Sequence, residues 1–215
     1  MIPIHTVFGG LLVLFGLIGS LRGWAKEVIV AFSVILALFV EHVLLTFVPP
    51  LGALFRNLAP QSQFYTRSIL FVIIAVFGYA SPTIASRLGA KVARERLQDL
   101  LLGFFLALIN GFLIIGTLLS FLNAVYYGVP PEMLLEQQKV DENNQPVFDE
   151  SGNPVMEVVG YHPEAKGIGG IVPPGPDSTS ANLMAFLPPE LIAQSSAVLY
   201  VAVAAAFVFV IVVFI

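Results

Sequence analysis

Five long apolar runs follow one another along the chain, separated by more polar connections. A helix that crosses a bilayer needs about 20 predominantly apolar residues, because the hydrocarbon core is about 30 Å thick. Backbone groups in lipid must be paired within their own segment, so runs of this length predict helices. The pattern predicts five membrane-spanning helices, over Ile4–Leu21, Val28–Val48, Ser68–Ser86, Leu101–Leu122 and Leu191–Ile215.

The composition leads to the same class of protein. Hydrophobic residues make up 57% of the chain and charged residues 11%, whereas an average soluble domain has about 25% charged residues. This excludes an ordinary cytoplasmic enzyme and a disordered chain, and a net charge of −4 argues against nucleic-acid binding. The chain has no cysteine, so disulfides, thiolate metal sites and cysteine nucleophiles are excluded. We therefore expect an all-α integral membrane protein.

The charges around the first run distinguish it from a secretory signal peptide. Such a peptide has basic residues before its apolar stretch, but residues 1–3 contain neither Lys nor Arg. The positive charges follow the run instead, at Arg22 and Lys26. We expect this first helix to be retained in the mature protein.

Lys and Arg collect on one side of the predicted membrane. Two connections on that side contain six of them, Arg22, Lys26, Arg87, Lys91, Arg94 and Arg96, while the helices on the other side are flanked by Arg56 and Arg67. Cytoplasmic loops carry an excess of Lys and Arg. The N-terminus and residues 123–190 are therefore expected to lie outside the cytoplasm.

Two of the connections also have helical patterns. Leu51, Leu54, Phe55 and Leu58 share one helical face, which predicts a short helix lying in the membrane interface. The segment Arg87–Leu100 is also expected to be helical, with Arg87, Lys91 and Arg94 on a common face. That face either binds anionic lipid headgroups or simply anchors the cytoplasmic side.

The long connection contains an internal repeat of eight residues. Asp141–Phe148 is followed by the similar unit Asp149–Met156, and each unit places turn-forming residues before a short β-prone run. We expect a small two- or three-stranded β-hairpin insert near Gln138–Gly160, followed by a flexible linker over Gly167–Ser180. The repeat is either an edge that binds a partner or an elaboration of the loop.

Three polar residues lie inside the predicted spans. Glu41 and His42 occupy the second and Asn110 the fourth, and ionisable groups within a membrane are candidates for function. Glu41 and His42 are either a proton or cation relay or residues near the outer interface that reach water. The amide of Asn110 is expected to bond to another helix and hold the two together.

Small residues predict close helix packing. Gly103, Ala107 and Gly111 are spaced four apart on the fourth span, and Gly16 and Gly19 precede Gly23 on the first. Such faces let helix backbones approach closely. They predict a tightly packed bundle, with oligomerisation as a further possibility.

No arrangement of residues in the sequence indicates catalysis or a cofactor. No nucleophile is set against a base, and no glycine-rich loop joins a strand to a helix. His5, His42 and His162 are too scattered to predict a metal site. We expect a protein that is not an enzyme and that binds neither a metal nor a cofactor.

Two motifs stand out in this layout. The first is the turn Arg22-Gly23-Trp24-Ala25-Lys26-Glu27 after the first span, and the second is Asp99 followed by Gly103 and Gly111 in the fourth. Together with the four helices they resemble the colicin V production protein (CvpA) family of bacterial inner-membrane proteins. The resemblance covers about Thr6–Asn123. Relatives often have glycine where this chain has Ala107, and a basic residue where it has Asn110.

The resemblance implies a four-helix transmembrane core in residues 1–125. Residues 126–190 then form an extracytoplasmic acidic insert, and residues 191–215 add a fifth, C-terminal transmembrane helix. It implies a multi-pass protein of the bacterial plasma membrane. It also implies a role in colicin V production or export and in envelope integrity, and some relatives use the same unit to anchor a periplasmic serine protease.

Two interpretations of the turn between the first spans remain open. It is either a cytoplasmic docking element or a structural turn in which the dipole of the second helix favours Glu27. Trp24 suits an anchor at the interface.

Two functional hypotheses follow. In the first, the protein supports bacteriocin production and envelope homeostasis through membrane-protein partners or self-association, in contact with lipids but not with nucleic acid. In the second, it is a small transporter or channel subunit with Glu41, His42 and Asn110 lining a polar path.

Overall fold

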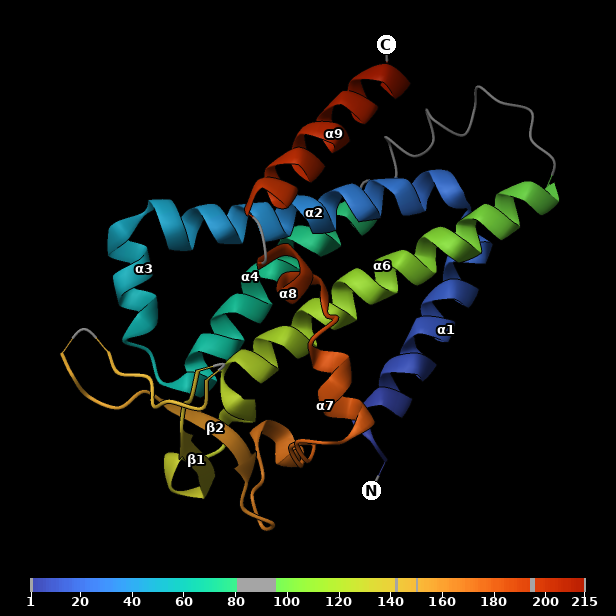
Figure 1. The fold of residues 1–215 in the computed structure, drawn as a ribbon. Helices are drawn as coiled ribbons and strands as arrows, with labels where there is room; N and C mark the ends of the chain where they lie inside the picture. Colours follow the sequence, from blue (N-terminus) through green and yellow to red (C-terminus); the bar gives the residue numbers. More distant parts are fainter. Residues whose placement is uncertain (1, 81–95, 142, 150, 194–195, 215) are drawn as a thin grey trace.

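Four long helices form the body of the molecule in the computed structural model, which describes residues 2–80, 96–141, 143–149, 151–193 and 196–214 (Figure 1). They are α1 (Ile4–Arg22), α2 (Trp24–Phe47), α4 (Pro60–Ala80) and α6 (Arg96–Ala124). α1 packs along α6, and α2 packs against both α4 and α6. This arrangement brings the first and fourth predicted spans side by side, although α2 and α4 come between them in the sequence.

Three of these helices are confirmed as long and apolar enough to cross a membrane. They are α1, α2 and α6, the last over Leu97–Ala124. α4 and the C-terminal α9 (Ser196–Phe214) are helices in the positions predicted for the third and fifth spans. Their crossing of the membrane, and with it the four-plus-one count, stays a prediction. α2, α4 and α6 begin before their predicted runs, because a helix can continue past the hydrocarbon edge into more polar sequence. α9 begins five residues later than the predicted fifth span, since Leu191 belongs to the separate helix that ends at Ala193.

The short helix predicted between the second and third spans is confirmed as a helix. It is α3 (Pro49–Arg56), and its two prolines occupy the first turn, where their missing N–H groups cost no hydrogen bond. The predicted basic helix over Arg87–Leu100 falls largely outside the described residues, which resume at residue 96. Arg96 and the residues after it open α6.

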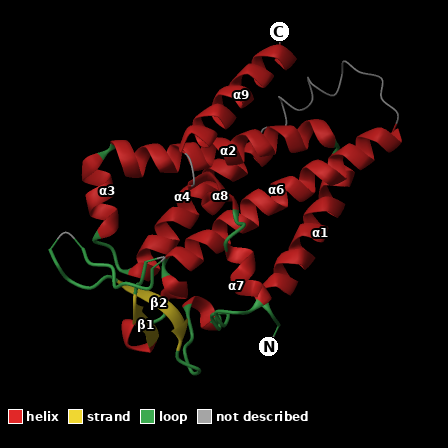
Figure 2. Cartoon of the chain, in the orientation of Figure 1, coloured by secondary structure: helices red, strands yellow, loops and turns green. Residues whose placement is uncertain are grey.

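A small antiparallel sheet confirms the predicted β insert. Strand β1 (Leu134–Gln138) pairs with β2 (Met156–Tyr161), with a bulge between Leu135 and Glu136. The two strands flank most of the repeat rather than lying within it. The short 3-10 helices η1 (Tyr126–Gly128) and η2 (Pro131–Met133) connect α6 to β1. Figure 2 shows these two strands as the only yellow elements of the described chain, below an otherwise helical fold.

The eight-residue repeat forms two equivalent turns. The carboxylate of Asp141 accepts hydrogen bonds from the backbone N–H groups of residues 143 and 145, and that of Asp149 from those of residues 151 and 153. Gly152 has a positive φ of 82°, and Asn144 also has a positive φ, of 61°, in the first unit. These backbone hydrogen bonds to the carboxylate lower the pKa of Asp149, with the bond from Asn153 contributing most.

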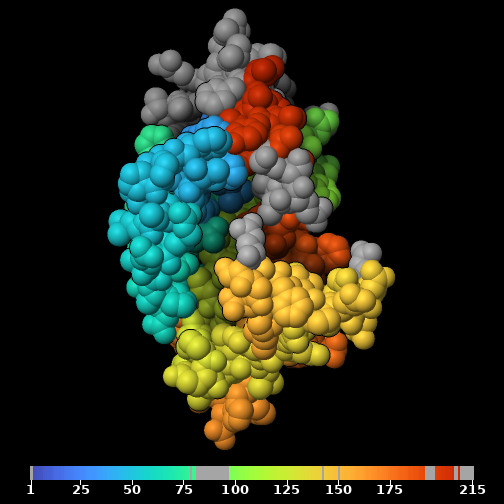
Figure 3. All heavy atoms as spheres, turned by 60° about the vertical axis from the view of Figure 1, so that its left-hand side comes forward, coloured from blue at the N-terminus to red at the C-terminus, as the bar shows by residue number. Residues whose placement is uncertain are grey.

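The segment predicted as a linker contains defined elements. η3 (Ile168–Gly170) and α7 (Thr179–Met184) lie within or across it, and α8 (Pro188–Ala193) follows. Gly167 packs so closely on the backbone of Tyr127 that a Cβ there would lie 2.2 Å from the Tyr127 carbonyl oxygen. Gly167, the first residue of the predicted linker, is therefore held against Tyr127. Figure 3 shows the insert, in yellow and orange, below the helices drawn in blue and cyan.

The main hydrophobic core joins α2, α4, α6 and α9. Its fully buried side chains include Val30 and Val34 of α2, Phe71 of α4 and Phe121 of α6. The rings of Phe71 and Phe121 meet edge to face, with centroids 5.9 Å apart. Two clusters of polar residues lie near opposite ends of this core, one around Glu27 and the other around Glu41.

Candidate functional site

The turn between α1 and α2 is set by one glycine. Gly23 has a φ of 85° and donates its N–H to the carbonyl oxygen of Gly19, which ends α1. A side chain here would be strained in backbone conformation. Its Cβ would also lie 2.8 Å from an oxygen of Asp99. The glycine therefore lets the chain reverse direction while α6 approaches the turn.

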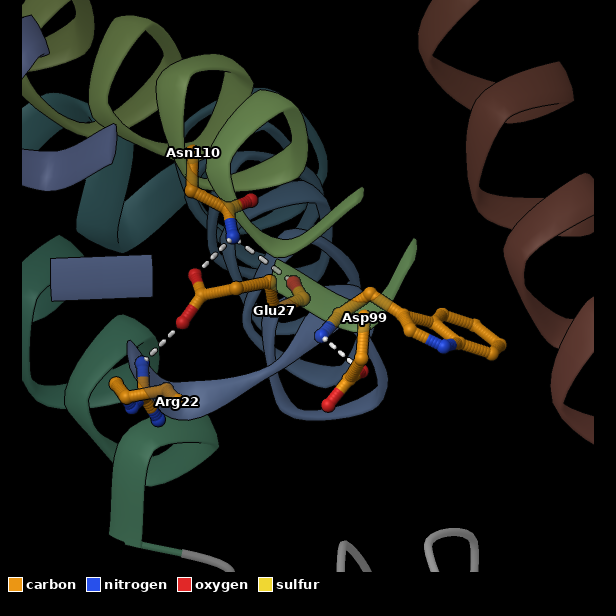
Figure 4. A network of polar contacts seen from close by, with 5 residues as sticks. Arg22, Glu27, Asp99 and Asn110 are labelled. Carbon is orange, nitrogen blue, oxygen red and sulfur yellow. Dashed lines mark hydrogen bonds and ion pairs between the residues drawn. The ribbon is translucent and has the colours of Figure 1, made fainter. Parts of the chain in front are cut away.

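Glu27 is the centre of a buried network at this turn. The residue is 1% exposed, and its Oε1 lies 2.6 Å from Nη1 of Arg22. The side-chain nitrogen of Asn110 donates to Oε2 of Glu27 at 2.9 Å and to its backbone oxygen at 2.8 Å. Figure 4 shows Arg22 and Asn110 approaching this carboxylate from opposite sides. Glu27 also lies in the first turn of α2, where the helix dipole favours a negative charge.

Asp99 binds the other side of the turn. Its Oδ1 accepts a hydrogen bond from the backbone N–H of Trp24 at 3.2 Å (Figure 4). That N–H is one of the first groups of α2, which have no partner within the helix. The guanidinium of Arg22 also lies over the ring of Tyr79, 4.4 Å from its centroid. The network therefore joins the ends of α1, α2, α4 and α6.

The two ladders of small residues pack against each other within one chain. A Cβ on Gly103 would lie 2.7 Å from the backbone oxygen of Gly19, and one on Gly19 would lie 2.0 Å from the Cβ of Ala107. At their outer ends, Gly16 contacts Phe104 and Gly111 contacts Phe15. These glycines allow α1 to lie close enough to α6 for Asp99 and Asn110 to reach the turn.

Not every residue of the motif belongs to the network. Lys26 is exposed, whereas Trp24 is half-buried and joins the network through its backbone N–H, which donates to Asp99. The six-residue turn thus combines residues that bind α6 with at least one charge that faces outward.

A second ion pair lies two-thirds of the way along α2. Glu41 is 5% exposed and pairs with Nε of Arg67 on α4, whose guanidinium lies 4.1 Å from the ring centroid of Phe121. The neighbouring His42 lies 3.3 Å from the hydroxyl of Tyr200. In the sequence, Arg67 bore only on the orientation of the chain in the membrane. Its position as a charge beside an apolar run was the available signal that it could pair with Glu41.

A cavity of about 410 Å³ opens beside this second pair. Glu41, His42 and Arg67 line it together with Ser120 of α6 and Glu190 of α8. Ser120 donates its hydroxyl to Glu190 at 3.2 Å. Glu190 was not singled out in the sequence because it belongs to a separate segment, 149 residues after Glu41.

The structure brings Glu41 and His42 to one cavity and places Asn110 at the other site. Residues 28–40 of α2, between Glu27 and Glu41, contain no ionisable side chain. At about 1.5 Å per residue, the two carboxylate-bearing positions are roughly 21 Å apart along the helix. Among the described residues, no group of three or more His, Asp or Glu side chains could hold a metal ion.

The fold and the two polar networks define a mostly helical protein with membrane-span-like helices and a small β insert. The colicin V production protein family model matches residues 4–140, more than half of the chain. The chain therefore belongs to the colicin V production protein family, and the match extends past α6 into the β insert. No curated protein and no solved structure matches the chain.

Proposed function

We propose that the protein supports bacteriocin production or secretion and envelope homeostasis as a non-enzymatic, multi-pass protein of the bacterial inner membrane. It acts through protein partners that bind at the turn between α1 and α2. The observation that carries this proposal is the outward-facing charge of Lys26 on a turn that Glu27, Asp99 and Asn110 hold in place. A rigid turn with an exposed charge is a suitable docking element because little conformational entropy is lost on binding.

The test separates docking from folding by choosing an outward-facing residue. Lys26→Glu reverses a charge that makes no hydrogen bond or ion pair with Glu27 in the network. Lys166→Glu is the matched control, because Lys166 is also exposed but lies in the insert. Arg22 and Glu27 are unsuitable for this purpose, since substituting either one also breaks the turn.

The measurement is complementation of a bacterium that lacks its own family member. Toxin secretion and detergent tolerance are assayed, together with in-cell crosslinking from position 26. We expect Lys26→Glu to lose crosslinked partners and complementation, and Lys166→Glu to retain both. Full activity of Lys26→Glu at normal protein levels would refute docking at this turn.

A second candidate function is transport, favoured by the cavity that Glu41, His42 and Arg67 line. Ionisable residues facing a cavity within a membrane commonly mark substrate or ion pathways. Against this, the stretch of α2 between Glu41 and Glu27 buries the aliphatic side chains Val30, Val34 and Ala37. Solute flux into liposomes that is abolished by Glu41→Gln would favour transport over docking.

A further inference from the structure

A further cavity, of about 350 Å³, lies beyond the end of α6 and is lined by β2, α7 and α8. Pockets that hold small ligands measure roughly 300–1,000 Å³, so this volume admits a small molecule. Its polar lining comes from Asn123 of α6, Tyr127, Tyr161 of β2 and Glu190 of α8, while prolines and the apolar face of α7 complete it. It lies at the other end of α6 from the Asp99 turn.

The charge of the cavity is negative. Among the described residues that line it, Glu190 carries the one formal charge, and none is Lys, Arg or His. The neighbouring cavity, which Glu190 also lines, contains Arg67, but that guanidinium is paired with Glu41. Ser120 donates a hydrogen bond to Glu190 without supplying a charge. A partly buried carboxylate is stabilised by a cation, so the cavity favours a positively charged ligand.

Two tyrosines line the same cavity, and Tyr161 presents the reachable ring because Tyr127 is 1% exposed and packs against it. The rings of Tyr127 and Tyr161 meet at 88°, with centroids 5.9 Å apart. The faces of aromatic rings attract ammonium groups, and proteins use aromatic rings to recognise quaternary ammonium ligands. Burial raises the pKa of both tyrosines, so both phenols are neutral at physiological pH and do not compete as anions.

Tyr127 is held in an unusual conformation at this position. Its φ is 58°, which is costly for a bulky residue and is often found at functional sites. The close packing of Gly167 on its backbone keeps it there. The Tyr127 hydroxyl is buried and has no hydrogen-bond partner. Tyr127 therefore has both a strained backbone and an unpaired hydroxyl beside the cavity.

We propose that this cavity binds a small organic ammonium ion, with Glu190 as its charge partner and the ring of Tyr161, supported by Tyr127, as its aromatic wall. The ammonium group belongs either to a free amine such as choline or ethanolamine or to the headgroup of an aminophospholipid. This site is independent of the docking turn, which lies at the other end of α6.

The first test is calorimetric titration of the purified full chain in an uncharged detergent. Choline and ethanolamine are compared with 3,3-dimethylbutanol, the uncharged isostere of choline. We expect at least one amine to bind and the isostere to bind at least about tenfold more weakly, because it cannot pair with Glu190. Equal binding of the isostere would show an apolar pocket and overturn the proposal.

Two pairs of variants connect binding to the named residues. Glu190→Gln is expected to weaken amine binding about tenfold, while Glu157→Gln removes the same charge from an exposed position of β2 and leaves affinity unchanged. Tyr161→Leu is expected to weaken binding about three- to tenfold, and Tyr161→Phe to retain it because the ring remains. Unchanged affinity in both Glu190→Gln and Tyr161→Leu would overturn the assignment. The tyrosine pair decides if Glu190→Gln does not fold.

The two sources of the ammonium group are separated with lipid. Native mass spectrometry compares retention of phosphatidylethanolamine and phosphatidylglycerol by the wild-type chain and by Glu190→Gln. Selective retention of phosphatidylethanolamine that depends on Glu190 indicates a headgroup, and binding of free amines alone indicates a soluble ligand. If neither free amines nor phosphatidylethanolamine binds, the proposal is wrong.

Discussion

The side-chain amide of Asn110 donates to both the carboxylate and the backbone oxygen of Glu27, at 2.9 and 2.8 Å, across 83 residues of sequence. The two residues lie on α6 and α2, and both are buried. Asn110 therefore supplies two hydrogen bonds to a residue whose charge is balanced by Arg22. These two hydrogen bonds hold the turn between α1 and α2 against α6.

Replacing Asn110 should destabilise the bundle. Asn110→Ala removes the partner of the buried Oε2 of Glu27, and leaving a buried acceptor unpaired costs about 1–3 kcal/mol. Ile109→Ala is the control, because this neighbour is 52% exposed on the outer side of α6. The free energy of unfolding in detergent should fall much further for Asn110→Ala than for Ile109→Ala. Equal losses would show that the amide contributes little beyond its volume.

Arg22 and Glu27 should be energetically coupled. Arg22→Gln leaves a buried carboxylate without its cation, and we expect a loss of about 1–3 kcal/mol. This is below the ~3–5 kcal/mol of a fully buried pair, since Arg22 is partly exposed. Arg22→Gln combined with Glu27→Gln should cost less than the sum of the single changes. A double-mutant cycle on unfolding measures the coupling, and strict additivity would contradict it.

The contact between α1 and α6 should reject a methyl group at Gly19. Gly19→Ala would place a Cβ 2.0 Å from that of Ala107, whereas Gly10→Ala, on the same helix, meets no atom within 4 Å. Forced overpacking costs about 1–3 kcal/mol, so Gly19→Ala should lower the melting temperature clearly. Gly10→Ala should leave it nearly unchanged or raise it slightly. A similar response of both variants would disprove the close approach.

High pH should weaken the insert through Tyr127. Burial raises the pKa of this phenol in the folded protein, so the unfolded chain loses the proton first, near pH 10. The folded state then binds more protons than the unfolded state, and stability falls as the pH rises above that value. Stability from this group is fully present below about pH 10. Absorbance titration of phenolate should show a late-titrating tyrosine that is missing in Tyr127→Phe.

The orientation of the chain can be tested at the repeat. The excess of Lys and Arg in two connections predicts that residues 123–190 lie outside the cytoplasm. Alkaline phosphatase inserted at Asn144 should therefore be active, and green fluorescent protein inserted there should not fluoresce. Fusions at Lys26 should behave in the opposite way. A fluorescent fusion at Asn144 would reverse the topology and place the ammonium cavity on the cytoplasmic side.

The sequence determined the elements that depend on local pattern. Long apolar runs specify helices in lipid because only a helix pairs every backbone group within its own segment. α1, α2 and α6 appear where those runs lie. The repeated turns of the insert were also predictable, because Asp141, Asp149 and Gly152 act on backbone groups within a few residues. The motif residues Gly23, Glu27 and Asp99 could be named in advance, but their partners could not.

Only the tertiary structure decided which polar side chains meet. Glu27, Asn110 and Arg22 form one network, and Glu41 pairs with Arg67 and shares a cavity with Glu190. In the sequence, Glu41 and Glu190 are 149 positions apart, and no periodicity connects the residues that meet. Helix packing sets their distances, because the small residues of α1 and α6 allow a closeness that larger side chains would prevent. The hydrophobic pattern of the sequence specifies each helix, whereas the partner of a buried charge depends on which helix packs against the one that carries it.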